Sequence, residues 1–219
     1  MKDFLQPVHS IHGVRARFLG RISGVEVDTD RLATVARLEP HHRAIVSEMG
    51  FSWDVCWRAE QVHGAEIAVV QGDGIAEAET ILNVDGLITN AASLVLGIYV
   101  ADCGALYLAD RKTGALGLLH SGKKGTELGI LPKAISMMQE EYGTDPADLV
   151  VALAPCIRPP AYDVDFAKEI HQQAIDAGVK EENYYDSGVC TSSDLKAFYS
   201  YRIEKGATGR MLALLGKVI

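Results

Sequence analysis

Two apolar segments on either side of a short polar turn limit most strongly what this chain can fold into. The segments are residues 94–109 and 115–120, and the turn between them is residues 110–114, D-R-K-T-G. Apolar runs that flank a glycine-containing polar cluster are typical of an antiparallel β-hairpin. We therefore expect a hairpin at the centre of the fold.

This hairpin brings a thiol and an imidazole close to each other. Counting back along both strands from the turn places Cys103 within one position of His120. A regular five-residue loop would pair Gly104 with His120 and turn Cys103 to the other face, because side chains alternate along a strand. A shared site requires a β-bulge or a four-residue loop. We predict such an irregularity, because the small, polar residues 102–104 interrupt the strand.

Strand and helix patterns are mixed along the rest of the chain. Apolar spacing predicts helices at residues 29–38, 40–49, 128–142 and 165–177, with Pro40 in the first turn of the second helix. Strands are expected at residues 12–18, 24–28, 53–57, 66–70, 149–154, 198–203 and 211–218, and a loop at residues 72–74. This order indicates an α+β fold of layered mixed β-sheets with flanking helices.

Length and charge restrict the class of protein. A chain of 219 residues is long enough for one well-buried domain, and we expect a single domain over residues 1–219. The formal net charge of −8 argues against a general affinity for nucleic acid or for an anionic membrane. No apolar run is long enough to span a bilayer, and the N-terminus has no signal-peptide core. We therefore expect a cytoplasmic protein.

The cysteines give no sign of a disulfide framework. The chain contains four of them, at positions 56, 103, 156 and 190, without a C-x-x-C pair. Neither a disulfide scaffold nor a zinc knuckle is indicated by this spacing. We expect all four thiols to be reduced.

His63, Cys103 and His120 are candidates for a metal site. Two imidazoles and a thiolate can hold zinc and leave a fourth position for water, which then ionises near neutral pH. Asp102 is a candidate to hydrogen-bond a ligating imidazole. The alternatives are a buried thiol beside two hydrogen-bonded imidazoles, and a metal-free pair in which Cys103 is the nucleophile and His120 the base.

A basic turn follows His120. Residues 121–125, S-G-K-K-G, place Lys123 and Lys124 between glycines at the start of a helix. Backbone N–H groups at a helix start and two ammonium groups suit a bound anion. The alternative is a turn whose lysines are simply solvated.

A series of short motifs occurs in a fixed order along the chain. The motifs are Q-V-H-G at 61–64, D-G-L-I-T at 85–89, A-D-C at 101–103, H-S-G-K-K-G at 120–125, P-C-I at 155–157, C-T at 190–191, F-Y-S-Y-R at 198–202 and T-G-R at 208–210. Together they resemble the motifs of the bacterial polyphenol oxidase, or laccase-domain, family. Their order and spacing cover the chain from about residue 12 to its end.

The resemblance implies a metal-dependent enzyme of purine metabolism. Zinc would be bound by the two motif histidines and the A-D-C cysteine, which are His63, His120 and Cys103, and these residues would also be catalytic. The implied chemistry is phosphorolysis of adenosine, inosine, guanosine and methylthioadenosine, together with deamination of adenosine. The small-molecule partners would be a purine nucleoside and phosphate. The resemblance also implies an α+β fold and a cytoplasmic monomer.

Binding of the substrate and its anion would involve Lys123, Lys124, Arg43 and Gln61. The family's G-W-R-G is G-K-K-G here, so that a stacking surface and a bidentate guanidinium are replaced by two point charges. The family's N-R pair on the first helix corresponds to His42 and Arg43, whereas the residues alone favour a surface position for Arg43. Gln61 opens the Q-V-H-G motif.

The family name also suggests a copper-dependent phenol oxidase. A blue-copper centre takes two histidines and a cysteine, and an oxygen-reducing copper cluster needs many further imidazoles. Seven histidines without an H-x-H pair do not readily supply both. Copper-dependent polyphenol oxidation and a non-catalytic, metal-containing binding protein are therefore the alternatives to a zinc-dependent purine nucleoside enzyme.

Overall fold

Two mixed β-sheets form the centre of the structure, a computed structural model that describes residues 3–72 and 80–219. The first sheet contains, in order, β1 (Val14–Leu19), β11 (Met211–Lys217), β6 (Val95–Val100), β2 (Cys56–Ala59) and β4 (Thr80–Ile81). The second contains β10 (Tyr184–Asp186), β9 (Leu149–Leu153), β7 (Gly104–Asp110), β8 (Leu116–Ser121), β5 (Gly86–Thr89) and β3 (Ile67–Val69). Parallel and antiparallel pairs occur in both sheets.

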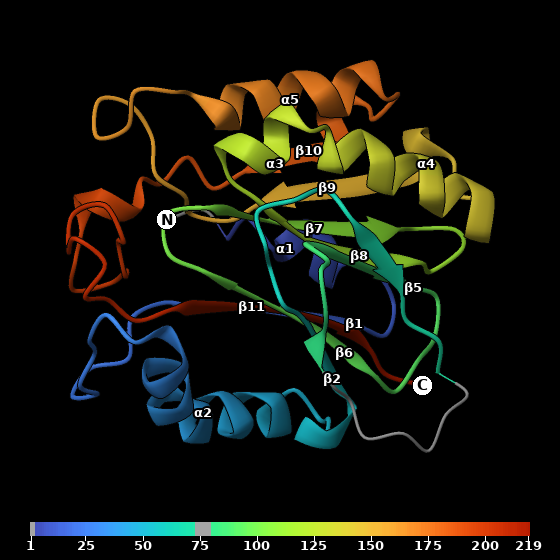
Figure 1. Cartoon of the computed structure of the whole chain (residues 1–219). Helices are drawn as coiled ribbons and strands as arrows, with labels where there is room; N and C mark the ends of the chain where they lie inside the picture. Colours follow the sequence, from blue (N-terminus) through green and yellow to red (C-terminus); the bar gives the residue numbers. More distant parts are fainter. Residues whose placement is uncertain (1–2, 73–79) are drawn as a thin grey trace.

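Helices cover the outer faces of the two sheets, so the fold has four layers (Figure 1). The long helix α2 (Arg31–Glu48) covers the first sheet, and α3 (Lys123–Glu127), α4 (Ile130–Tyr142) and α5 (Phe166–Asp176) cover the second. The helix α1 (Gln6–His9) precedes β1, and single 3₁₀ turns lie at Trp53–Val55, Pro146–Asp148, Glu181–Asn183 and Thr191–Ser193. No helix in the described part of the chain is both long enough and apolar enough to cross a membrane.

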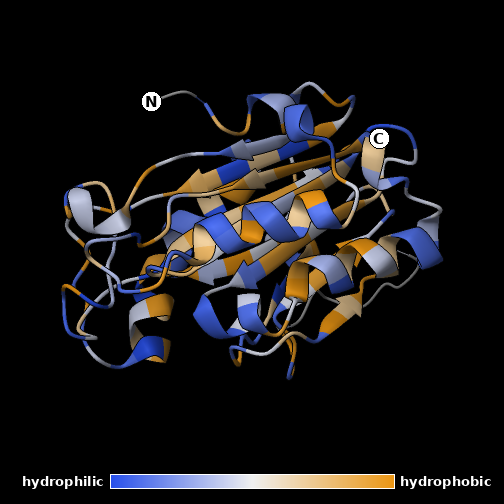
Figure 2. Cartoon of the chain, turned by 90° about the horizontal axis from the view of Figure 1, so that it is seen from above, coloured by the Kyte–Doolittle hydropathy of each residue, from blue (hydrophilic) through white to orange (hydrophobic). Residues whose placement is uncertain are grey.

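Alternation of side chains along β7 explains this layering. Ala105, Tyr107 and Ala109 belong to the core between the two sheets, whereas Leu106 and Leu108 belong to the core beneath α4 and α5. A strand that is buried on both faces has a continuous apolar sequence, as seen here. In Figure 2 apolar residues concentrate on the strands, while the covering helices mix apolar and polar residues. The predicted layered α+β fold is confirmed.

The central hairpin has a four-residue loop. The backbone N–H of Asp110 donates to the carbonyl of Ala115 at 2.9 Å, and further along the strands Ala105 pairs with His120. This register differs by one residue from that of a five-residue loop. It allows Cys103, just before β7, to share a site with His120. The predicted irregularity is therefore confirmed and is a short loop.

Other expectations for the chain are wrong. Residues 24–28 and 198–203 form loop and turn instead of strands. Two helices are expected over residues 29–49, but the structure has one helix there, α2 (Arg31–Glu48), with Pro40 inside it. A buried stripe runs past the proline and packs α2 on the first sheet, which offsets the cost of about 3 kcal/mol for an interior proline. The stripe consists of Thr34, Leu38, His42 and Val46. The loop expected at residues 72–74 lies partly outside the described residues.

Candidate metal centre and its cavity

His63, Cys103 and His120 meet at one end of the two sheets. Their nitrogen and sulfur atoms lie within 4.8 Å of one another, and we call them the His–Cys–His cluster. His63 comes from the loop before β3, Cys103 from the bend before β7, and His120 from β8. The two imidazole rings meet edge to face, with their centroids 4.9 Å apart. The structure thus brings the three predicted ligands together.

Asp85 holds two members of this cluster in place. Its carboxylate is fully buried and accepts a hydrogen bond of 2.8 Å from Nδ1 of His120. The same carboxylate accepts the backbone N–H groups of Val62, His63 and Gly64 at 3.1, 2.9 and 2.7 Å. Since Nδ1 of His120 is occupied, Nε2 is the nitrogen left for a metal. Sequence reasoning did not find Asp85, although it opens the D-G-L-I-T motif.

These contacts favour the charged forms of the buried groups. Burial by itself would raise the pKa of Asp85, but hydrogen bonds from His120 and from the backbone of Gly64 and His63 keep it below its ordinary value. Burial also opposes ionisation of Cys103, yet the two histidines lower its pKa to about 6. The pKa of His120 rises to about 9 despite burial, because Cys103 and Asp85 stabilise the imidazolium. A thiolate is the form in which cysteine binds a metal.

The donor set of the cluster fits a metal ion. Two imidazole nitrogens and one thiolate sulfur are borderline-soft ligands that suit zinc or copper. Three protein ligands leave a fourth position open, as in catalytic metal sites. Among the described residues, this cluster is the group of potential ligands with the spacing that a metal ion needs.

The backbone around the cluster is unusual. Gln61, His63 and Asp102 have φ angles of 66°, 60° and 82°, in the left-handed region that residues with a Cβ rarely adopt. Gly122 lies so close to Cys103 that a Cβ on this glycine would be 2.5 Å from the cysteine sulfur. Both features show that contacts with the surrounding residues determine the backbone conformation around the cluster.

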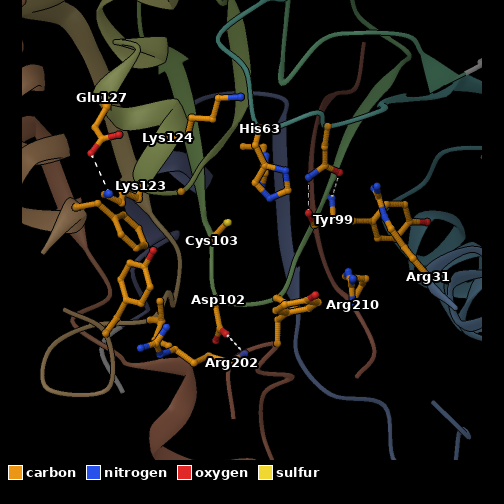
Figure 3. Close-up of a pocket in the computed structure, with 18 of the residues that line it drawn as sticks. Arg31, His63, Tyr99, Asp102, Cys103, Lys123, Lys124, Glu127, Arg202 and Arg210 are labelled. Carbon is orange, nitrogen blue, oxygen red and sulfur yellow. Dashed lines mark hydrogen bonds and ion pairs between the residues drawn. The ribbon is translucent and has the colours of Figure 1, made fainter. Parts of the chain in front are cut away.

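A cavity of about 1020 Å³ opens beside the cluster (Figure 3). Aromatic side chains provide flat surfaces in its wall: Tyr99, Tyr162, Phe166 and Tyr201. Six basic side chains also line it: Arg31, Lys123, Lys124, Arg202, Lys205 and Arg210. The acidic residues in the lining are Asp102 and Glu127. This local excess of positive charge, in a chain with a net charge of −8, favours an anionic ligand.

Lys123, Lys124 and Gln61 line the cavity. The lysines are the first two residues of α3 and are exposed, with Nζ of Lys123 at 3.5 Å from Glu127. Gln61 is buried, and both ends of its side-chain amide bond to the backbone of Tyr99. The Gln61 amide therefore fixes the wall that carries Tyr99.

The structure does not bring Arg43 to the cavity. Its guanidinium pairs with Glu39 at 2.8 Å and lies over the ring of Trp53, on the exposed side of α2. The neighbouring His42 turns inward instead, where its ring centroid is 5.5 Å from that of Tyr99. The cause is the buried stripe of α2, which contains position 42 and excludes position 43.

Sequence reasoning missed the three arginines of the cavity, Arg31, Arg202 and Arg210. Arg31 is the first residue of α2, and Arg210 immediately precedes β11. The position of Arg210 in the T-G-R motif is the signal that could have identified it.

Asp102 makes different contacts from those expected. Its carboxylate accepts hydrogen bonds from the hydroxyl groups of Thr191 (2.6 Å) and Ser200 (3.1 Å) and from the backbone N–H of Arg202 (2.8 Å). Asp102 thus fastens the segment that carries Tyr201 and Arg202 into the wall of the cavity. The expected bond to a cluster imidazole is made by Asp85.

Comparison with known proteins shows to which family the chain belongs. The family model for the multi-copper polyphenol oxidoreductase laccase matches residues 23–170 and 163–217. The chain belongs to this laccase family. It is 31% identical to the purine nucleoside phosphorylase YlmD of Geobacillus stearothermophilus, over 89% of this chain and 82% of that protein. It is 29% identical to a purine nucleoside phosphorylase of Deinococcus radiodurans, over 90% of this chain and 83% of that protein.

A solved structure has the same fold as this chain. The crystal structure of YlmD from Geobacillus stearothermophilus covers 98% of this chain, and this chain covers 94% of that one. The TM-score is 0.83 at 27% sequence identity. The resemblance that the motifs indicated is therefore confirmed.

Proposed function

We propose that this laccase-family protein is a metal-dependent purine nucleoside phosphorylase. The observation that carries the proposal is the meeting of basic and aromatic side chains in one cavity beside the His–Cys–His cluster. A phosphorylase must hold an anion next to a flat base, and these side chains offer both surfaces. The names of its relatives support the same activity.

Phosphorolysis requires that the cavity bind both phosphate and the nucleoside. An oxygen of phosphate attacks C1′ of the ribose, the bond from C1′ to the purine nitrogen breaks, and the bonding electrons leave with the base. Lys123 and Lys124 would hold the phosphate through charge-assisted hydrogen bonds. The aromatic side chains would hold the base. The volume of about 1020 Å³ is large enough for a nucleoside and a phosphate ion together.

We propose zinc as the bound metal, held by the His–Cys–His cluster. Two imidazoles and one thiolate with an open position are ligands of catalytic zinc, although copper accepts the same donors. When bound, the ion would act as a Lewis acid that polarises an oxygen ligand or promotes the ionisation of water. Asp85 would fix the orientation of the His120 ring toward it.

Deamination of adenosine is a second candidate activity. The observation that favours it is the fourth position left open by the three-residue donor set. Deamination consumes water and releases ammonia, so it does not depend on phosphate. We further propose that residues 1–219 act as one domain in a cytoplasmic monomer, which sedimentation velocity and cell fractionation would test.

One set of assays separates these functions. Inosine with phosphate should give hypoxanthine and ribose 1-phosphate, and no product without phosphate. Adenosine in the absence of phosphate reports deamination, and a phenol with added copper reports oxidase activity. Cys103→Ala should abolish the first activity, whereas Arg43→Gln, outside the cavity, should retain it. A protein that contains metal but lacks every activity would refute the proposal and indicate a binding protein.

A further inference from the structure

Four of the six basic side chains of the cavity form two pairs on separate sides of it. One pair is Lys123 and Lys124, from α3 on the second sheet. The other is Arg31, from α2, and Arg210, directly before β11 of the first sheet. The helices α2 and α3 lie on opposite outer faces of the fold (Figure 1). In Figure 3 the two pairs lie on opposite sides of His63 and Cys103. We call them the lysine pair and the arginine pair.

The arginine pair has no acidic partner among residues 3–72 and 80–219. Arg31 donates to the backbone carbonyl of Glu60 at 3.1 Å, and Arg210 donates to those of Thr208 and Gly209 at 3.2 and 2.9 Å. The two arginines lie on the same side of the cavity in Figure 3, and burial and the charge of Arg31 lower the pKa of Arg210, against the opposite effect of Tyr201, Cys103 and Asp102. An anion between them would favour the charged form of Arg210.

The type of side chain indicates which anion. A guanidinium presents a planar fork of N–H groups that binds phosphate oxygens in pairs, and its charge is retained when it is partly buried. Backbone carbonyls already hold both arginines, so little side-chain freedom would be lost when a ligand binds. A guanidinium with these properties binds a phosphate group better than an ammonium group, which is a single point charge.

Phosphorolysis of a nucleoside uses one anion, inorganic phosphate, for which the lysine pair suffices. We propose that Arg31 and Arg210 form a second subsite, which binds a phosphate group carried by the substrate, so that the cavity takes purine nucleotides. The identity of the base and ribose rests on the proposed function. The arginine pair itself rests only on the geometry of the cavity.

Calorimetric titration with inosine 5′-monophosphate and with inosine tests this inference. The wild-type protein should bind the nucleotide at least tenfold more tightly than the nucleoside, a difference of about 1.4 kcal/mol. Arg31→Gln and Arg210→Gln should each remove most of this preference and leave the affinity for inosine within about twofold. Arg43→Gln is the matched control, because it removes a guanidinium from the same helix but outside the cavity, and it should keep the preference.

Three outcomes would overturn the subsite. The first is equal affinity of the wild type for the nucleotide and the nucleoside, and the second is a preference for the nucleotide that survives both arginine changes. The third is that Arg31→Gln and Arg210→Gln lose as much affinity for inorganic phosphate as for the nucleotide. The last would mean that the arginines hold the attacking phosphate, and the proposed function would stand. A nucleotide preference that depends on the arginines, in a protein without phosphorylase activity, would keep the subsite and refute the proposed function. Circular dichroism should confirm that the variants fold, and Arg210→Lys, which retains the charge, should keep part of the preference.

Discussion

Replacement of Asp85 by Asn should weaken both the fold and the metal site. The carboxylate accepts four hydrogen bonds, two on each oxygen. Oδ1 accepts His120 Nδ1 and the N–H of His63, and Oδ2 accepts the N–H groups of Val62 and Gly64. An amide keeps one oxygen and replaces the other with a donor. Whichever way the amide turns, two donors lose their acceptor.

The expected magnitude follows from this count. A buried donor without a partner costs about 1–3 kcal/mol, and the affected backbone groups are only partly buried, so the free energy of unfolding should fall by about 2–3 kcal/mol. Loss of the partner that orients a metal-binding histidine weakens metal affinity by about 10- to 100-fold. That range corresponds to about 1.4–2.7 kcal/mol.

Asp110→Asn is the control for this experiment. Asp110 is also fully buried and also accepts backbone N–H groups, those of Lys112 at 2.7 Å and Thr113 at 3.2 Å. It lies at the turn of the hairpin, at the opposite end of β7 from Cys103. Urea unfolding should show a loss of stability in both variants. Competition with a chromophoric chelator should show a loss of zinc affinity only in Asp85→Asn. Wild-type zinc affinity in Asp85→Asn, or an equal loss of zinc affinity in Asp110→Asn, would refute the reasoning.

Three further predictions concern the same cavity. The protein purified without added metal should carry about one zinc ion per chain, and alanine at any member of the His–Cys–His cluster should remove it; elemental analysis that finds unchanged zinc would contradict the ligand assignment. Gly122→Ala should lower the metal content, because the new Cβ would lie 2.5 Å from the Cys103 sulfur while the φ angle of −97° permits alanine; full occupancy in a folded variant would show that the thiolate can move aside. Changing Lys123 and Lys124 together to Met should weaken phosphate binding at least tenfold and leave zinc unchanged; equal phosphate affinities would mean that both lysines are only solvated.

The sequence was sufficient where local signals determine the structure. The apolar segments around residues 110–114 predict the hairpin. The need for Cys103 and His120 to share a site predicts either a β-bulge or a four-residue loop, and the structure has the loop. Gly143 ends α4 with a φ angle of 70°, as a glycine after a helical pattern predicts. The ligand set follows from this hairpin together with the family motifs.

The sequence was insufficient where contacts with residues far away in the chain determine the backbone conformation. Residues 198–203 are apolar and aromatic enough for a strand, and Phe198 and Tyr199 are buried in the core between the sheets. Ser200 and the backbone of Arg202, however, bond to Asp102, about one hundred positions away in the chain. The hydrophobicity of residues 198–203 therefore predicts that they are buried, but the hydrogen bonds to the Asp102 carboxylate determine their backbone conformation.

The expectation that Arg43 lines the cavity comes from the resemblance, whereas the residues alone favour the surface position that the structure shows. Division of α2 at Pro40 hides the stripe of buried residues that crosses it. In one continuous helix, Arg31 lies three residues before Thr34 and therefore on the side of that stripe, whereas Arg43 does not. The tertiary contacts that keep the helix continuous past Pro40 thus also determine which arginine reaches the cavity.

Backbone strain connects the metal centre with the wall of the cavity. The left-handed conformations of His63 and Asp102 cost roughly 1–3 kcal/mol each and persist only where surrounding contacts enforce them. Asp85 enforces the first through the N–H groups on either side of His63, and the hydrogen bonds that Asp102 itself accepts enforce the second. Cys103 directly follows Asp102, so the contacts that fasten the cavity wall also set the position of the thiolate. Of the two buried carboxylates, Asp85 holds the histidines of the cluster, and Asp102 holds both the wall of the cavity and the position of Cys103.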